Sequence, residues 1–303
     1  MRYKYYLAVI TAFSIWGFFS LVLKSLDAFP AFDILIYRAV TSVFIMLLVV
    51  VFLRPKTLRK NIQLFRTISK KNQQSIVIIN LLSGLFLALN WFIFIYVMNN
   101  VSVSATSLAY LICPILTMVL AYLILKEKLF KIQWISVALS LISCLLLSLG
   151  NFMDLFYSMI IAFTYAIYLV LQRKNQEMDR FLVLTFQIGV AVVLLIPFTP
   201  SYISNIEKTT FFYAIIALIA VVFTIVPMYL NIYALKGLNS AIVGIFIYLN
   251  PIINFLLAVF YFKEHISFLQ GLSFSLIAVS VIIFNIPNFR KQIKKRKATH
   301  IKI

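Results

Sequence analysis

The chain has 303 residues, of which 63% are hydrophobic and 12% are charged, and its formal net charge is +19. Soluble domains are about 45 to 50% apolar and about 25% charged, so this composition excludes an ordinary soluble protein and indicates a membrane protein.

The apolar residues form blocks of about 20 residues with little polar alternation, which is the length that crosses a ~30 Å hydrocarbon core as a helix. Strands of a membrane barrel would be shorter and would alternate. We therefore predict an all-α integral membrane protein with ten transmembrane helices. In chain order the expected spans are Tyr5–Lys24, Phe32–Leu53, Gln74–Met98, Ser102–Leu125, Lys131–Leu149, Asn151–Leu171, Phe181–Phe198, Thr209–Leu235, Asn239–Phe262 and Ser267–Ile286.

The lysines and arginines alternate between the two sides of these spans. With the N-terminus in the cytoplasm, 23 of the 27 fall in cytoplasmic segments, three fall in outer loops (Lys24, Lys208 and Lys263) and Arg38 lies within a span. Cytoplasmic loops of membrane proteins carry such an excess of Lys and Arg. We expect both termini in the cytoplasm, membrane lipid around the chain and no nucleic acid partner. This excess of basic residues on the cytoplasmic side also explains why the C-terminal segment is basic, so a specific lipid-binding function is not needed to explain it.

Two stretches of the chain repeat one another: "SLAYLICPILTMVLAYLILKEK" at 107–128 and "GIFIYLNPIINFLLAVFYFKEH" at 244–265. At an offset of 137 the matched positions are Pro114 with Pro251 and Glu127 with Glu264. Nearer an offset of 150, "IAFTYAIY" at 161–168 resembles "TAFSIWGF" at 11–18.

Each half of the chain therefore contains five spans, and an odd number makes the second half enter the membrane from the opposite side. We expect a first repeat at 1–149, a second repeat at 150–286 and a basic cytoplasmic tail at 287–303. Inverted repeats of this kind are typical of secondary transporters, although a duplication kept only for packing would leave the same pattern.

Four short stretches resemble a known family in their order and spacing: "FDILIYR" at 32–38, "NWFIFIYVMNN" at 90–100, "SLAYLICP" at 107–114 and "YLNP" at 248–251. They resemble the RarD branch of the drug/metabolite transporter superfamily, whose members have two EamA domains, and the resemblance covers essentially the whole chain. It implies a permease with a central cavity. RarD proteins are named for predicted chloramphenicol permeation, and similar members export amino acids or other metabolites.

The chain departs from this family pattern at three positions. Lys126 and Lys263 stand where the family usually has Gly before a glutamate, and Cys113 stands where Asn usually precedes the first proline. The second proline does follow an asparagine, Asn250.

Several aromatic, amide and proline residues are expected near the middle of the membrane and form the candidate substrate site. They are Trp16, Tyr110, Pro114, Tyr248, Asn250 and Pro251, with Asn90 and Trp91 somewhat toward the outside. Arg38 and the residue that matches it in the second half, Gln187, complete the ten candidate residues. Such side chains can line a cavity for a small solute. The alternative is that they join helices, as polar side chains often do in membranes. Each proline is also expected to bend its helix, because it leaves the carbonyl four residues earlier without its partner.

Arg38 is expected about 9 Å below the outer edge of the second span, where a membrane arginine costs up to about 3 kcal/mol unless it is paired or hydrated. Asp33 is five residues away and should lie on another face of the helix. The matching residue of the second half is the neutral Gln187. Arg38 therefore either snorkels outward or binds a carboxylate. Similarly, Glu127 and Glu264 either control gates or are solvated helix ends.

These observations favour a secondary transporter that moves a small organic metabolite or drug by alternating access across the bacterial inner membrane. The alternatives are a non-transporting membrane scaffold and, less readily, a membrane-embedded enzyme, which would need paired acids or a His cluster inside the spans. We expect no cofactor, no metal and no catalytic residues.

Overall fold

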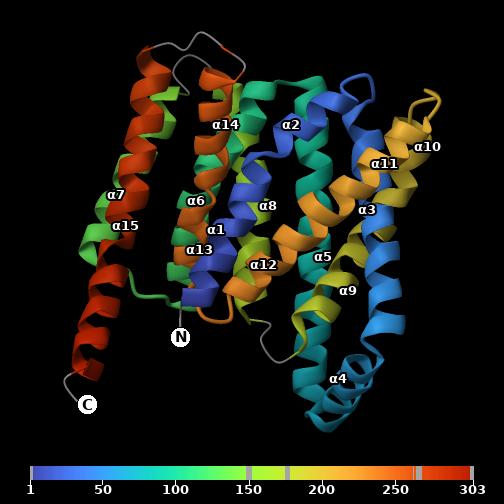
Figure 1. The fold of residues 1–303 in the computed structure, drawn as a ribbon, viewed down its shortest axis with the longest axis horizontal. Helices are drawn as coiled ribbons and strands as arrows, with labels where there is room; N and C mark the ends of the chain where they lie inside the picture. The colour runs from blue at the N-terminus through green and yellow to red at the C-terminus, as the bar shows by residue number, and fades with distance from the viewer. Residues whose placement is uncertain (1–2, 148–151, 175–177, 262, 264–267, 301–303) are drawn as a thin grey trace.

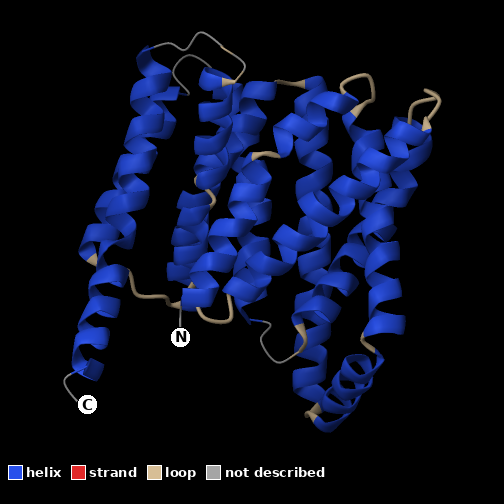
Figure 2. Ribbon diagram, in the orientation of Figure 1, coloured by secondary structure: helices blue, strands red, loops and turns tan. Residues whose placement is uncertain are grey.

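The computed structural model describes residues 3–147, 152–174, 178–261, 263 and 268–300, and every regular element in them is helical (Figures 1 and 2). Nine helical segments of this part of the chain are long and apolar enough to cross a membrane, and the shorter apolar helix Lys131–Leu147 makes the tenth. The predicted all-α membrane fold with ten helices is confirmed.

The ten spans are built from the following elements. The first half contains span 1 (α1 Tyr3–Gly17, α2 Phe19–Leu23, η1 Lys24–Leu26), span 2 (α3 Ala31–Leu48, η2 Val49–Leu53), the connecting α4 (Pro55–Thr67), span 3 (α5 Lys70–Asn100), span 4 (α6 Val103–Leu125) and span 5 (α7 Lys131–Leu147). The second half contains span 6 (α8 Phe152–Lys174), span 7 (α9 Arg180–Leu195, η3 Ile196–Phe198, α10 Thr199–Tyr202), span 8 (α11 Thr210–Leu218, η4 Ile219–Ile225, α12 Val226–Ala234), span 9 (α13 Ser240–Phe246, α14 Leu249–Phe260) and span 10 (α15 Phe268–His300).

Two helical segments were missed by the sequence prediction. The basic segment after span 2, expected as a loop, folds into α4, in which Leu58, Ile62 and Phe65 recur at helical spacing. Helix α15 continues through Pro287 to His300, where only a tail was expected. Both segments lie beyond the apolar runs, so hydropathy alone gave no sign of a helix there.

Span 9 is divided into two helices, whereas a single bent helix was expected. Helix α13 ends at Phe246 and α14 begins at Leu249, two residues before Pro251. Because Pro251 has no N–H to donate, the carbonyl of Ile247 accepts instead from the N–H of Asn250 at 3.1 Å. In span 4, by contrast, α6 continues through Pro114 without a break.

The main contacts between spans are preserved when each span is exchanged with the one five positions away. Spans 2 and 7, 4 and 9, and 5 and 10 pack against each other. Span 3 packs on spans 6 and 7, as span 8 packs on spans 1 and 2, and span 4 packs on span 6 as span 9 packs on span 1. In Figure 1, α1 and α8 run in opposite directions, as inverted halves require.

Both ends of the described chain lie at the same end of the bundle, which we call the lower end because of its place in Figure 1, and α4 also lies there. The connection between η1 and α3 lies at the opposite, upper end. At one edge of the bundle α7 and α15 are joined through serines: Ser136 donates to the carbonyl of Ser280 at 2.6 Å, and Ser140 donates to the Ser280 hydroxyl at 2.9 Å. Such bonds stabilise helix pairs in lipid.

The close contact between spans 3 and 7 depends on Gly84, and this gives a first prediction. A Cβ at Gly84 would lie 2.6 Å from the Cβ of Val190 and 3.0 Å from the backbone oxygen of Gln187. We expect Gly84→Leu to destabilise the fold by about 1 to 3 kcal/mol, as overpacking usually does. The measurement is thermal unfolding in detergent.

The matched control for this substitution is Gly189→Leu in α9, because a Cβ at Gly189 meets nothing within 4 Å. Equal destabilisation by both substitutions would show that the contact at Gly84 has no special role.

Candidate functional site

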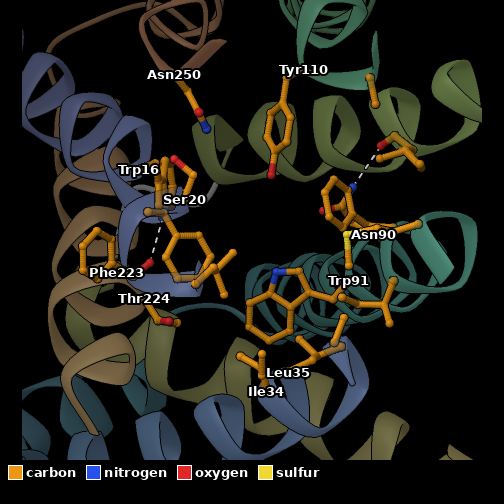
Figure 3. A pocket seen from close by; sticks show the side chains of 18 of the residues that line it. Trp16, Ser20, Ile34, Leu35, Asn90, Trp91, Tyr110, Phe223, Thr224 and Asn250 are labelled. Atoms are coloured by element: carbon orange, nitrogen blue, oxygen red, sulfur yellow. Dashed lines mark hydrogen bonds between the residues drawn. The ribbon is translucent and has the colours of Figure 1, made fainter. Parts of the chain in front are cut away.

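A cavity of about 440 Å³ lies between the two halves of the bundle (Figure 3). Its size falls within the range of small-molecule sites, about 300 to 1,000 Å³. Residues of spans 1, 2, 3, 4, 6, 8 and 9 line it, and it extends upward to the connection around Asp27 and Phe29. The wall is mostly apolar and aromatic, with a few polar side chains aimed inward.

The centre of the cavity lies where the two repeats meet. At the offset of 137 residues, three pairs of matched positions contribute both of their members to the wall. These pairs are Trp91 with Met228, Tyr110 with Ile247, and Cys113 with Asn250. Other wall residues match a residue of the other repeat that does not line the cavity. Arg38, for example, matches Gln187. The cavity is therefore central but displaced toward the upper end.

The structure brings six of the ten predicted substrate-site residues together at this cavity. They are Trp16, Arg38, Asn90, Trp91, Tyr110 and Asn250. The other four do not line it and are buried in the protein: Pro114, Gln187, Tyr248 and Pro251. Figure 3 shows Tyr110, Asn250 and Trp91 pointing toward the same space from different spans.

The two prolines nevertheless act on the wall indirectly. Tyr110 lies four residues before Pro114, and Ile247 lies four residues before Pro251, so the carbonyls that the prolines leave without their usual helical partner belong to two cavity residues. Backbone of this kind is tolerated at membrane depth only where protein or a water-filled cavity surrounds it.

Arg38 projects from α3 into the cavity and is held between aromatic rings. Its guanidinium carbon lies 5.3 Å from the ring centroid of Trp91 and 5.6 Å from that of Phe19. Its buried Nε has no hydrogen-bond partner within the described chain. Nearby Asp33 is occupied by another cation, Lys208 at 2.9 Å. The charge of Arg38 is thus stabilised by π faces, while its N–H groups have no carboxylate partner among the described residues.

A chain of neutral polar side chains forms another part of the wall, between spans 1 and 9. The hydroxyl of Ser20 donates to Oδ1 of Asn254 at 2.9 Å, and Nδ2 of Asn254 donates to Oδ1 of Asn250 at 2.7 Å. The sequence prediction of the site did not include Ser20 or Asn254. The available signal was that Asn254 lies one helical turn after Asn250, on the same face.

Span 8 contributes Phe223 and Thr224 to the wall, and these also were missed. They lie in η4, a π-helical segment, and the indole Nε1 of Trp16 donates to the carbonyl of Phe223 at 2.8 Å (Figure 3). This bond fixes the orientation of the Trp16 ring. Short π segments are frequent at functional sites, but their position cannot be read from hydropathy.

Asn90 combines the two roles that the sequence left open. Its Nδ2 donates to the carbonyl of Ile161 at 2.9 Å and to the hydroxyl of Thr164 at 3.1 Å, so it joins span 3 to span 6. It also lines the cavity. The amide of Asn90 therefore both joins two helices and forms part of the cavity wall.

Gln187 lies below the cavity, in a packed polar cluster between spans 3, 6 and 7. Its Nε2 donates to Oδ1 of Asn80 at 2.8 Å, and its Oε1 accepts from Nε2 of Gln172 at 2.7 Å. All three side chains are buried. The contact between spans 3, 6 and 7 is thus filled by bonded amides at this level.

Glu127 bridges the two halves at the lower end. Its carboxylate accepts from the backbone N–H groups of Ser240 at 2.9 Å and Ala241 at 3.1 Å, which begin α13. The chain reaches this position because Lys126 adopts a left-handed conformation, φ 53°, and Lys263 does the same at φ 57°. These are the two positions where the related proteins usually have glycine, which adopts this conformation without strain. Glu264 lies outside the described residues.

Within the described residues, no three His, Cys, Asp or Glu side chains gather closely enough to hold a metal ion. The arrangement suits binding of a small organic solute: one cation, several aromatic faces and a set of amides surround a central space.

The fold and the cavity define a multi-pass membrane protein with a solute-sized site between two similar halves. The sequence model of the EamA-like transporter family matches residues 3–149 and 153–286, and the chain belongs to this family.

Similar curated proteins have transporter names or the name RarD. The chain is 28% identical over 294 residues to an uncharacterized transporter of Pseudomonas aeruginosa, covering 94% of each chain. It is 26% identical over 282 residues to Protein RarD of Escherichia coli, covering 92% of each. A crystal structure matches with a TM-score of 0.72 at 13% identity, over 96% of this chain and 99% of that one, which shows the fold alone.

The contact made by Glu127 gives a second prediction. A carboxylate that accepts two N–H groups at a helix start stabilises that helix, and losing such a cap costs about 0.5 to 2 kcal/mol. We expect Glu127→Ala to lower the unfolding temperature and to speed hydrogen exchange at the amides of Ser240 and Ala241. Lys128→Ala, at an exposed neighbour, is the control. Unchanged exchange at these two amides would contradict the capping role.

Proposed function

We propose that this protein is a secondary transporter that moves a small organic anion by alternating access across the bacterial inner membrane. The solute occupies the central cavity, its anionic group is bound by Arg38, and its apolar body lies against the aromatic wall. The observation that carries the proposal is Arg38, an arginine inside a membrane cavity that lies against the rings of Phe19 and Trp91 and has no carboxylate partner among the described residues.

The environment of Arg38 supports binding of a carboxylate. An intramembrane cation is expensive unless something compensates it, and rings supply only about 0.5 to 2 kcal/mol. The guanidinium fork matches a carboxylate with two parallel hydrogen bonds. Because the matched residue of the other half is the neutral Gln187, the fold itself does not require a charge there.

The position of the cavity in the bundle supports alternating access. The cavity extends to the upper end, whereas the bonded amides around Gln187 fill the contact between spans 3, 6 and 7 below it. Inverted repeats can exchange these two arrangements, because each half can adopt the conformation of the other. Arg38 and the amides of Asn90 and Asn250 would then contact the solute from either side.

The orientation follows from the charges. The lower end carries both termini and the basic helix α4, and the positive-inside rule places such an end in the cytoplasm. The cavity then extends toward the periplasm. We assign no enzymatic reaction to the chain.

This function predicts a specific response to changes at Arg38. Hydrogen bonds to a charged group contribute about 1.5 to 3 kcal/mol, so Arg38→Gln should weaken binding of an organic carboxylate about tenfold or more. Arg38→Lys should restore part of the affinity, because a point charge lacks the fork. The measurement is a thermal-shift screen of the purified protein against carboxylates and their uncharged amides, followed by flux into liposomes for each solute that binds.

Lys24→Gln is the control for this test, since it removes an exposed cation at the same end of the bundle. The Arg38→Gln variant should bind a carboxylate and its amide equally well. If it keeps the preference of the unmodified protein for the carboxylate, Arg38 does not bind the anion.

A further inference from the structure

Two ion pairs connect spans 2 and 7 at opposite ends of the bundle. At the upper end, Nζ of Lys208 lies 2.9 Å from Oδ2 of Asp33, and the two side chains are 8% and 0% exposed. At the lower end, Arg54 donates through Nη1 at 3.0 Å and Nη2 at 3.1 Å to the two oxygens of Asp179, and the side chains are 31% and 23% exposed.

The two pairs have similar places in the two repeats, although their residues do not occupy matched positions. Asp33 lies in the first turn of α3, and Asp179 is the N-cap of α9. Arg54 follows the end of span 2, and Lys208 follows the end of span 7. Each acid at the start of one helix is thus paired with a base beyond the end of the other. The sequence gives no hint of this, because the paired residues are 125 and 175 positions apart.

The two acids differ in what else holds them. Asp179 accepts from the N–H groups of Phe181 and Leu182 in the first turn of its own helix, α9, so these bonds hold the acid in place when the lower pair breaks. Asp33 accepts from the backbone N–H and the hydroxyl of Ser204, which lies in the same connection as Lys208. The two bonds from Ser204 therefore belong to the upper contact together with the ion pair.

We propose that the Lys208–Asp33 and Arg54–Asp179 pairs are the two latches of the transport cycle: the upper pair closes the upper end and the lower pair closes the lower end. This inference rests on the proposed alternating access. Helices α3 and α9 pack against each other. Both pairs are formed in this structure, so it corresponds to the occluded state of the cycle. If the two helices rock about their contact, one end separates while the other stays closed, so each open state has one broken pair.

The pairs differ in strength because they differ in burial. Water and salt screen a partly exposed pair, whereas a buried pair is screened little and its loss leaves an uncompensated charge. The lower latch should therefore open more readily than the upper latch. Added salt should weaken the lower pair and leave the upper pair unchanged.

The test measures access to each end in the full-length protein, using cysteine reporters and no substrate. Cys113 and Cys144 are replaced by serine, and a single cysteine is introduced at Ile34 or at Val183. These two residues occupy matched positions of α3 and α9, and both are buried. A membrane-impermeant maleimide labels the protein in lipid nanodiscs, where both ends are accessible.

The expected results have opposite signs for the two reporters. Arg54→Gln should speed labelling at Val183→Cys about threefold, the effect of a partly exposed pair, and slow labelling at Ile34→Cys. Lys208→Gln combined with Ser204→Ala, which also removes the hydroxyl contact to Asp33, should do the reverse, and by about tenfold or more because this pair is buried. Raising the ionic strength of the solution, with both ion pairs unmodified, should have the same effect as Arg54→Gln.

Lys56→Gln and Lys24→Gln are the controls, since each removes an exposed cation at the lower or the upper end. A variant that is merely unfolded would label faster at both reporters. The same change at both reporters in a variant whose thermal unfolding is unchanged, or no change at either reporter, overturns the proposal and means that α3 and α9 move as one unit.

Because labelling needs no solute, this test is independent of the proposed function. Reciprocal labelling without flux of any solute would keep the latches and remove the transport assignment. Flux without reciprocal labelling would keep the transport assignment and remove the latches.

Discussion

The structure depends on one constraint: in hydrocarbon, a polar group must find its partner within the protein. Most of the chain meets it with continuous helices. Three departures from regular helix lie at the cavity instead, namely the break before Pro251, the proline of α6 and the π-helical segment η4. At η4 the indole of Trp16 satisfies the carbonyl of Phe223. At these three places the irregular backbone lies where a solute or water can meet it.

The two halves are similar in packing but differ in the side chains that define the cavity. The contacts between spans exchange as inverted repeats should, and both lysines before the matched glutamates adopt the left-handed conformation. Arg38 and Gln187 break this equivalence. One faces a cavity between aromatic rings, and the other lies in a closed cluster of amides. Similar packing supplies two related conformations, and the unequal side chains give the site its chemical preference.

Charged residues in this membrane protein differ in what surrounds them. Asp33 and Lys208 are buried together, so each compensates the other where water is scarce. Arg54 and Asp179 are partly exposed and gain less from pairing. Arg38 has rings in place of an anion. Of these three sites, the cavity is therefore the one whose cation has no carboxylate partner among the described residues.

The sequence by itself determined the ten spans and much of the cavity wall. Apolar runs of membrane length give the spans, and a polar or aromatic residue such as Arg38 or Asn90 stands out within them because hydrocarbon offers it no partner. Only the tertiary structure decided which proline breaks its helix, since Pro114 and Pro251 both stand inside long apolar runs. It alone also paired Asp33 with Lys208 and Arg54 with Asp179, because contacts between distant segments depend on how the helices pack and leave no periodic signal along the chain.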